Sequence, residues 1–325
     1  MKLNENFDQL IKKEKRKRLL KTIAISFVTT VVLLFIGFTL INKRMEMQYK
    51  KAQEMANITD MIESPNLVSQ SQYLSTSGRV TSQLKSERFK NIDGYMVVAT
   101  PLEINFSLFG IGYGSGKNSS LTVPITKTKE IGAFSRENGE KLPLFFNPKH
   151  KESETQQEAK ETHEARTLSG FKNHVAEVAI SFKKPMTYDE IQAKIPENVL
   201  INWYWLGMAS DQLSATETVG KVIGINADET GKLSSESLKS KTSSAWSSPN
   251  YPSFVAAVKT AAEKRSYTVN GLDIYQDALK QVEKYPTLKS AKFSGIIVSG
   301  RTENLAKLDD APYVYATNVG LQAEI

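Results

Sequence analysis

The 325-residue sequence contains no cysteine and only three histidines, and both shortages limit its chemistry. Without cysteine there is no disulfide, no thiolate zinc site, no cysteine nucleophile and no lipid-modified N-terminal cysteine. The histidines, His150, His163 and His174, lack the HxxxH and HExxH spacings of metal-binding helices. We therefore expect neither metal catalysis nor a cofactor. A cysteine-free chain also suits an extracytoplasmic domain of a bacterium that does not rely on disulfides.

Other catalytic motifs are missing as well. The glycine run FGIGYGSGKNSS (109–120) lacks P-loop spacing, since Ile111 stands where the first glycine belongs, and a hairpin tip is the better interpretation. There is no GxSxG elbow, although the sequence alone leaves a Ser-His-Asp triad or a Ser-Lys dyad open. Two adjacent carboxylate pairs are expected to cap helices or to face solvent: Asp189 with Glu190, and Asp309 with Asp310. We therefore predict that the protein is not an enzyme.

The net charge of +7 suggests a nucleic-acid-binding protein, but the distribution of the charge excludes that interpretation. Residues 1–21 carry a net charge of +5, so the rest of the chain carries only +2. The basic residues of this segment are Lys2, Lys12, Lys13, Lys15, Arg16, Lys17, Arg18 and Lys21. We therefore expect no nucleic-acid partner and interpret the cluster as the flank of a membrane segment.

The segment that follows, TIAISFVTTVVLLFIGFTLIN (22–42), has no charged residue in 21 positions. At about 1.5 Å per residue, a helix of this length spans a hydrocarbon core of about 30 Å. The run is long for a signal peptide and has no small-x-small cleavage site, so an uncleaved anchor is predicted. Only Lys43, Arg44, Lys50 and Lys51 follow it closely, so the positive-inside rule places the N-terminus in the cytoplasm and residues 43–325 outside the cell.

The cytoplasmic segment carries one apolar stripe. Leu3, Phe7, Leu10 and Ile11 recur at i, i+4, i+7 and i+8, which places them on one face of a helix. This face either lies on an anionic lipid surface, held there by the basic residues, or binds in a groove of a cytoplasmic partner. About twenty residues cannot enclose a core, so the segment is not an independent domain.

The pattern of apolar runs and turn residues along the rest of the chain predicts an α+β fold. It comprises a single N-terminal transmembrane helix, a mainly β first extracytoplasmic domain and an α/β sandwich-like C-terminal domain. The predicted segments are 1–21 (cytoplasmic), 22–42 (transmembrane), 43–65 (stalk helix), 66–148 (mainly β), 149–167 (linker or solvated helix) and 168–325 (C-terminal domain). The stalk has a mixed stripe at helical spacing that could also self-associate. It comprises Met45, Tyr49, Ala52, Met55, Ala56, Thr59 and Ile62.

Strands alternate with helices in 168–325. Thr187 and Glu190 have capping-box spacing at the start of a short helix, and Thr302 is predicted to cap a later one. The stretch IPENVLINWYWLG (195–207) holds two of the three tryptophans, and it is either an aromatic ligand platform or a buried strand. Both faces of such a strand are apolar, which favours a central strand that is covered on both sides.

Three stretches resemble the sigma factor regulator family. HVAEVAISFKKPMTYDEIQAKIPENVLINWYWLG (174–207) and FSGIIVSGRTENLAKLDDAPYVYATNVG (293–320) are similar to its C-terminal domain. NFDQLIKKEKRKRLLKTIAISFVTTVVLL (6–34) resembles its N-terminal region, and 64–66 and 89–97 fit the continuation of that region. The residues that carry the C-terminal resemblance are Ile195, Pro196, Asn202, Trp203, Trp205 and Gly300.

The resemblance implies a membrane-anchored regulator similar to anti-sigma-M factors of bacilli, in the Firmicutes. Such proteins restrain an extracytoplasmic-function sigma factor and respond to the state of the cell envelope. This chain has only about 21 residues before the membrane helix, which is short for sigma binding. Either the apolar stripe suffices to bind a sigma factor, or the protein acts through a second membrane protein, or it has kept only the envelope-sensing part. The lipid bilayer is an expected partner in addition. A membrane-anchored envelope binding or assembly protein without a sigma partner remains the alternative.

Overall fold

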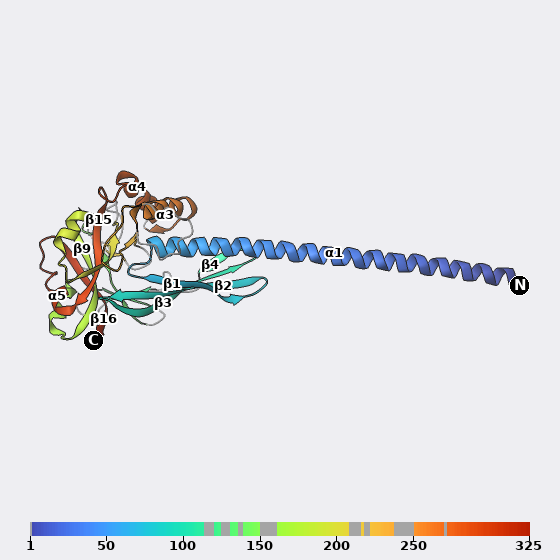
Figure 1. The fold of residues 1–325 in the computed structure, drawn as a ribbon, viewed down its shortest axis with the longest axis horizontal. Helices are drawn as coiled ribbons and strands as arrows, with labels where there is room; N and C mark the ends of the chain where they lie inside the picture. Colours follow the sequence, from blue (N-terminus) through green and yellow to red (C-terminus); the bar gives the residue numbers. More distant parts are fainter. Residues whose placement is uncertain are drawn as a thin grey trace.

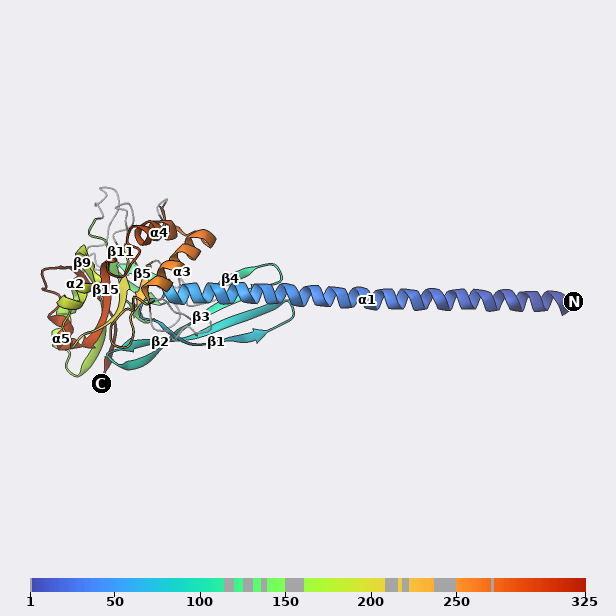
Figure 2. The same cartoon turned by 45° about the horizontal axis from the view of Figure 1, so that its top comes forward.

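A computed structural model gives the fold (Figure 1). The structure describes residues 2–113, 120–124, 131–135, 139–149, 161–207, 216–217, 222–236, 250–269 and 272–325. One long helix projects from a folded body, and a narrow antiparallel sheet lies along the part of the helix nearest to the body (Figures 1 and 2). The predicted fold class, α+β with a single N-terminal apolar helix, is confirmed.

The long helix, α1 (Lys2–Ile62), is continuous from the basic segment to the body. It ends where the side chain of Ser64 donates a hydrogen bond to the Thr59 carbonyl oxygen (2.9 Å) and Pro65 follows. Asn66 then adopts a positive φ of 51°, a conformation that asparagine tolerates better than most residues. This turn directs the chain back along α1 into the first sheet.

The first sheet has the strand order β1-β2-β3-β4, and every neighbouring pair is antiparallel. Its strands are β1 (Val68–Ser77), β2 (Thr81–Ile92), β3 (Tyr95–Ser107) and β4 (Ile111–Tyr113). Asp93 and Gly94 join β2 to β3 with φ angles of 55° and 89°, as a two-residue hairpin turn of type I′ requires. Alternate residues of β2 are buried, which gives the sheet one covered face.

The covered face packs on α1. Ala52 and Ala56 of the helix form a small core with Leu84, Leu102 and Ile104 of the sheet. The stripe predicted for the stalk therefore contacts a sheet of its own chain. This intrachain packing occupies the surface that self-association would need.

Smaller sheets connect the first sheet to the body. They are β5 (Ser120–Pro124), β6 (Ile131–Ser135) and β7 (Lys141–Leu142) in one sheet, and β8 (Phe145–Phe146) with β11 (Thr216–Glu217) in another. Phe145 packs in the core of the C-terminal sheet, as do Ile58 and Ile62 of α1. Residues from both sides of the predicted domain boundaries thus share one core.

The body contains an antiparallel sheet in the order β12-β10-β15-β9-β16. Its strands are β9 (His174–Thr187), β10 (Leu200–Trp205), β12 (Gly224–Asn226), β15 (Lys292–Arg301) and β16 (Val314–Glu324). The two-stranded ribbon of β13 (Thr268–Val269) and β14 (Leu272–Asp273) precedes α4. The tryptophan strand β10 lies between two neighbours and is almost completely buried, so the prediction of a covered interior strand is confirmed.

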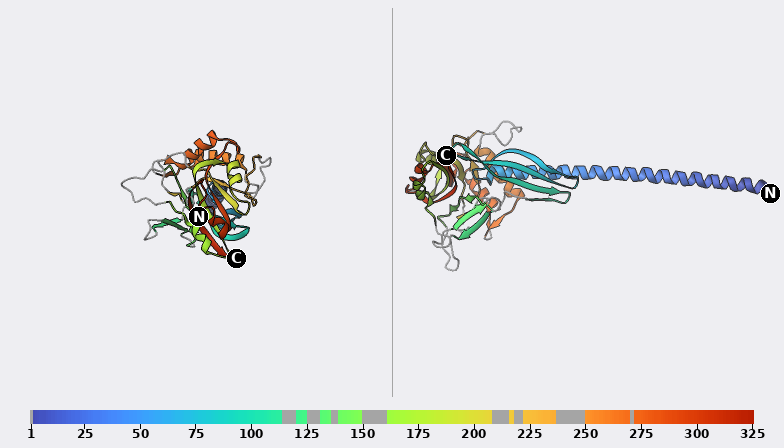
Figure 3. Two further views of the ribbon diagram at one scale, coloured as in Figure 1. Left: turned by 90° about the vertical axis from the view of Figure 1, so that its left-hand side faces the viewer. Right: turned by 90° about the horizontal axis from the view of Figure 1, so that it is seen from below.

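Helices pack on the body. They are the 3-10 helix η1 (Glu164–Gly170), α2 (Tyr188–Lys194), α3 (Tyr251–Lys264), α4 (Ile274–Lys284) and α5 (Thr302–Ala306). Of these, α3 and α4 lie together on one side of the body (Figure 3). The capping box of Thr187 and Glu190 is confirmed. The predicted cap at Thr302 is wrong, because Thr302 is the first residue of α5 and its hydroxyl donates to the Phe171 carbonyl oxygen (2.6 Å).

Candidate functional site

The basic N-terminal part of α1 is helical and extends away from the body (Figure 1). Leu3, Phe7, Leu10 and Ile11 share one face of this helix by their spacing. The side chain of Ile11 is exposed, whereas the other three side chains lie outside the described portion of the structure. The basic residues are exposed too: Lys12, Lys13, Lys15, Arg16, Lys17, Arg18 and Lys21.

The apolar run of α1 is exposed along most of its length. Within the described residues, α1 is the one helix long and apolar enough to cross a membrane, and its apolar window is not buried against any other segment of the protein. Large side chains such as Phe27, Leu34 and Phe35 are exposed. So many apolar side chains are unfavourable in water, and a bilayer is the environment that accommodates them. The chain is thus a single-pass membrane protein.

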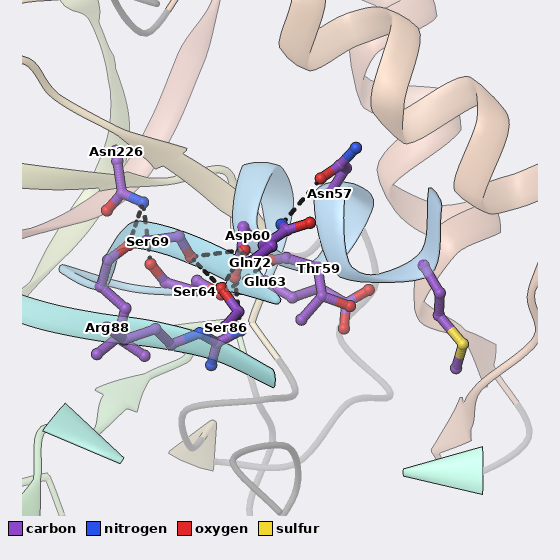
Figure 4. Close-up of polar contacts among 12 residues, drawn as sticks. Asn57, Thr59, Asp60, Glu63, Ser64, Ser69, Gln72, Ser86, Arg88 and Asn226 are labelled. Carbon is purple, nitrogen blue, oxygen red and sulfur yellow. Dashed lines mark hydrogen bonds and ion pairs between the residues drawn. The ribbon is translucent and has the colours of Figure 1, made fainter. Parts of the chain in front are cut away.

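The opposite end of α1 is fixed to the first sheet by a buried ion pair. Asp60 Oδ1 lies 2.6 Å from an Arg88 guanidinium nitrogen, and the two side chains are only 7% and 1% exposed. The Ser69 hydroxyl donates to the other Asp60 oxygen (2.6 Å), and Ser86 donates to Ser69 (3.0 Å; Figure 4). The pair joins α1 to the central strand pair of the first sheet, because Arg88 lies on β2.

Glu63, directly after α1, makes the second connection. Its carboxylate accepts hydrogen bonds from Arg265 (2.7 Å) and from the Tyr275 hydroxyl (2.8 Å). Arg265 also donates to the Met55 carbonyl oxygen (2.7 Å), so it clamps the last two turns of the helix. Burial, reinforced by the Glu63 carboxylate, raises the pKa of Tyr275, which stays neutral. These contacts join α1 to the ends of α3 and α4.

Lys90 makes the third connection, between the two large sheets. Its ammonium lies 2.8 Å from Glu177 on β9 and 2.6 Å from Glu140. Burial alone would lower the pKa of Lys90, but the two carboxylates outweigh it, so the pKa is raised and the lysine is charged. The Asn66 amide donates to the same Glu177 carboxylate (3.1 Å). Glu177 thus binds both Lys90 of the first sheet and the turn after α1.

Asn202 shows why a polar residue interrupts the tryptophan strand. The pairing of β10 with β15 has an irregularity between Ile201 and Trp203, and the intervening Asn202 donates to the Asn91 carbonyl oxygen (2.8 Å) in the first sheet. Nearby, the backbone amide of Asp93 donates to Ser299 Oγ (2.9 Å). Asn202 thus connects the C-terminal sheet to the end of β2, next to the β2–β3 turn.

The two tryptophans of β10 pack in the core and do not form a ligand platform. Trp203 and Trp205 are buried, and both contact Phe145, with ring centroids at 5.9 and 4.6 Å. The other resemblance residues are also structural in position: Ile195 and Gly300 are buried, and Pro196 lies in the exposed turn before β10.

A second polar cluster surrounds Asp309, which was expected to cap a helix or face solvent. That expectation is wrong: Asp309 is buried and binds Arg166 (2.7 Å) and His163 (3.2 Å). The Thr317 hydroxyl donates to the carboxylate and not to the imidazole, so the geometry differs from a nucleophilic triad. Thr162 also bonds to the Thr317 carbonyl oxygen (2.7 Å), which fixes this end of the predicted linker on β16.

The described residues include no group of three or more histidine, aspartate or glutamate side chains arranged to hold a metal. No sequence pattern singled out the residues that make these connections, which are Asp60, Glu63, Arg88, Lys90 and Arg265. One signal was present: Glu177 is the lone charge in the apolar strand HVAEVAISF, and a buried charge needs a partner. The site is therefore a junction of buried charges that joins the end of α1 to both large sheets.

Comparison with known families finds a match to the N-terminal part of the chain and another to its C-terminal part. The model described as "Sigma factor regulator C-terminal" matches residues 168–321, and "Sigma factor regulator N-terminal" matches residues 8–97. The N-terminal match includes the apolar run, the end of α1 and strands β1 and β2. No curated protein and no solved structure matches significantly. The closer resemblance to anti-sigma-M factors of bacilli stays a prediction.

Proposed function

The chain belongs to the sigma factor regulator family, and on this premise we propose that it controls an extracytoplasmic-function sigma factor in response to the state of the cell envelope. Membership supports an anti-sigma-factor-like regulator with a sigma factor as its partner. In the proposal, residues 43–325 form a non-catalytic sensing portion outside the cell, and the basic N-terminal segment acts in the cytoplasm. The excess of Lys and Arg before the apolar run supports this orientation.

The observation that carries the proposal is the continuity of α1. One helix of 61 residues contains the basic segment, the apolar run and Asp60 of the junction, and Glu63 follows directly after it. At about 1.5 Å per residue, the stretch from residue 11 to residue 62 is about 75 Å long. A tilt, shift or rotation of the outer end is therefore passed to the cytoplasmic end without an intervening joint. The pair of Asp60 with Arg88 couples such a movement to the first sheet, and the hydrogen bond of Asn66 to Glu177 couples it to the C-terminal sheet. Glu63 couples it to α3 and α4 through Arg265 and Tyr275.

At the cytoplasmic end, the stripe of Leu3, Phe7, Leu10 and Ile11 is the proposed contact with the sigma factor or with a second membrane protein. An amphipathic helix binds a groove through such a face. A signal that moves α1 would change how far this face stands from the membrane surface, and thus its access to the partner.

The test is a crosslinking pull-down from intact membranes with a tagged full-length chain. The wild type should recover a sigma factor, identified by mass spectrometry, and Phe7→Asp/Leu10→Asp should recover much less, because two charges interrupt the apolar face. Gln9→Asp/Lys12→Gln is the matched control: it changes the net charge by the same amount on positions away from the stripe, and it should retain the partner. If the wild type recovers no sigma factor under any envelope stress, the proposal fails in its direct form and the envelope-assembly alternative gains support.

A further inference from the structure

The far ends of the first sheet form one structural unit. The β1–β2 turn (78–80) and the β3–β4 turn (108–110) lie together, and the backbone amide of Leu108 donates to the Val80 carbonyl oxygen (3.1 Å). These two turns, here called the hairpin tips, point away from the body along α1 (Figures 1 and 3). Nothing in the described body extends beyond them except the helix itself.

The hairpin tips contact α1 where its apolar run ends. The Arg44 side chain donates to the Leu108 carbonyl oxygen (3.2 Å), and Arg44 is the second residue after the run 22–42. The Arg79 guanidinium lies over the Phe38 ring, 5.4 Å from its centroid. Phe38 lies about 6 Å along the helix inside the end of the run. The tips are therefore at the height of a membrane surface, given the span assigned to α1.

Two apolar side chains at the tips are uncovered. Phe109 is 94% exposed, and Val80 is half exposed. The exposure of Phe109 is built into its turn: the Ser107 amide donates to the Gly110 carbonyl oxygen (2.8 Å), and the Phe109 amide donates to Ser107 Oγ (3.1 Å). The phenylalanine is thus held outward by its own backbone, beside a helix that requires lipid.

We infer that the hairpin tips rest on the membrane, with Phe109 inserted in the interfacial layer of the leaflet next to the body. Aromatic side chains favour this layer, and Arg44 and Arg79 sit at the same end, where their guanidinium groups can bind lipid phosphates. The occupant of this surface is phospholipid, because the patch continues the apolar surface of α1. This inference is independent of the sigma partner.

The same sheet provides an internal control. Val98 is also strongly exposed (70%), but it pairs with Phe89 near the opposite end of the strands. About nine residues of strand, roughly 30 Å, separate it from the tip at Ser107. Val98 should therefore stay in water when the tips contact the bilayer.

The absence of cysteine makes the test direct. Full-length single-cysteine variants Phe109→Cys, Val80→Cys and Val98→Cys are labelled with an environment-sensitive fluorophore. They are then reconstituted in vesicles of phosphatidylcholine and phosphatidylglycerol that contain a lipid with a nitroxide near its headgroup. Quenching of the Phe109→Cys label should be several-fold stronger than that of Val98→Cys, with Val80→Cys between them. Iodide in the water should quench in the opposite order, and thermal unfolding should confirm that all three variants fold alike.

Equal lipid quenching at Phe109→Cys and Val98→Cys would overturn the inference. Protection of Phe109→Cys from both iodide and lipid quencher would also overturn it, because that result means coverage by protein, such as a second copy of the chain.

Discussion

The apolar run of α1 (22–42) and the outer segment that follows it (43–62) belong to one helix but lie in different surroundings. In the apolar run no residue is charged, and large side chains point outward on all sides. The outer segment instead buries small residues, Ala52 and Ala56, against the first sheet, and near its end Asp60 pairs with Arg88. Lipid accepts any apolar shape, whereas a protein partner requires particular sizes and charges. The bilayer therefore places few constraints on the side chains of the apolar run, whereas the protein contacts of the outer segment constrain both side-chain size and charge.

Removing the cation of the Asp60–Arg88 pair, in the outer segment, should cause the largest loss of stability. Arg88→Met leaves the buried Asp60 charge without its cation, which should lower the free energy of unfolding by about 3–5 kcal/mol. Urea unfolding of the protein in detergent measures it. Asp60→Asn/Arg88→Met should recover some of the loss, because neither charge of this pair remains. Lys50→Met, which removes an exposed pair with Glu46 on the same helix, should change nothing measurable; an equal loss there would refute the contrast.

Equal substitutions in the two segments should give an intermediate effect. Ala52→Leu places a larger side chain in the packed contact with the sheet and should cost about 1–3 kcal/mol in unfolding free energy. Ala24→Leu, within the apolar run, should leave stability and membrane insertion unchanged, because lipid chains rearrange around it. Thermal melts and membrane fractionation of the two variants measure the difference. The contrast fails if both variants melt at the same temperature.

The smallest expected effect concerns pH. The raised pKa of Lys90 means that its contribution to stability is complete below its ordinary value of 10.5 and is lost as the pH rises through the folded value. The apolar run has no charged group, so alkaline destabilisation should arise outside that run. Lys90→Arg keeps its charge at high pH and should reduce the slope of stability against pH above 10.5. Unfolding midpoints across this range measure the slope, and an unchanged slope would argue against Lys90 as its source.

The sequence predicted those features whose cause is local. The charge-free run of α1, the capping box at Thr187 and the two-sided apolar pattern of β10 each depend on neighbours in the chain, and each was found. The polar junction could not be predicted, because its pairs are distant in sequence: Lys90 with Glu177, and Glu63 with Arg265. Only the topology of the sheets brings these partners together.

Asn202 and Asp309 illustrate the same limit. An asparagine within a tryptophan strand and an aspartate after a short helix both look like surface residues, since polar side chains usually face water. Asn202 is instead the extra residue of an irregular strand pair and bonds to Asn91, and Asp309 is enclosed by Arg166, His163 and Thr317. Their partners come from segments that no local pattern links to them.

The unbroken length of α1 also sets an angular relation between the two sides of the membrane. Each residue of a helix turns the chain by about 100° as it advances by about 1.5 Å. The direction in which the Leu3–Ile11 stripe faces is therefore fixed relative to the orientation of Asp60 in the junction. Adding or removing a single residue between them would point the stripe at a different side of the membrane surface, even with every contact at both ends intact. The number of residues between the stripe and Asp60 thus determines which way the stripe faces for a given orientation of the junction.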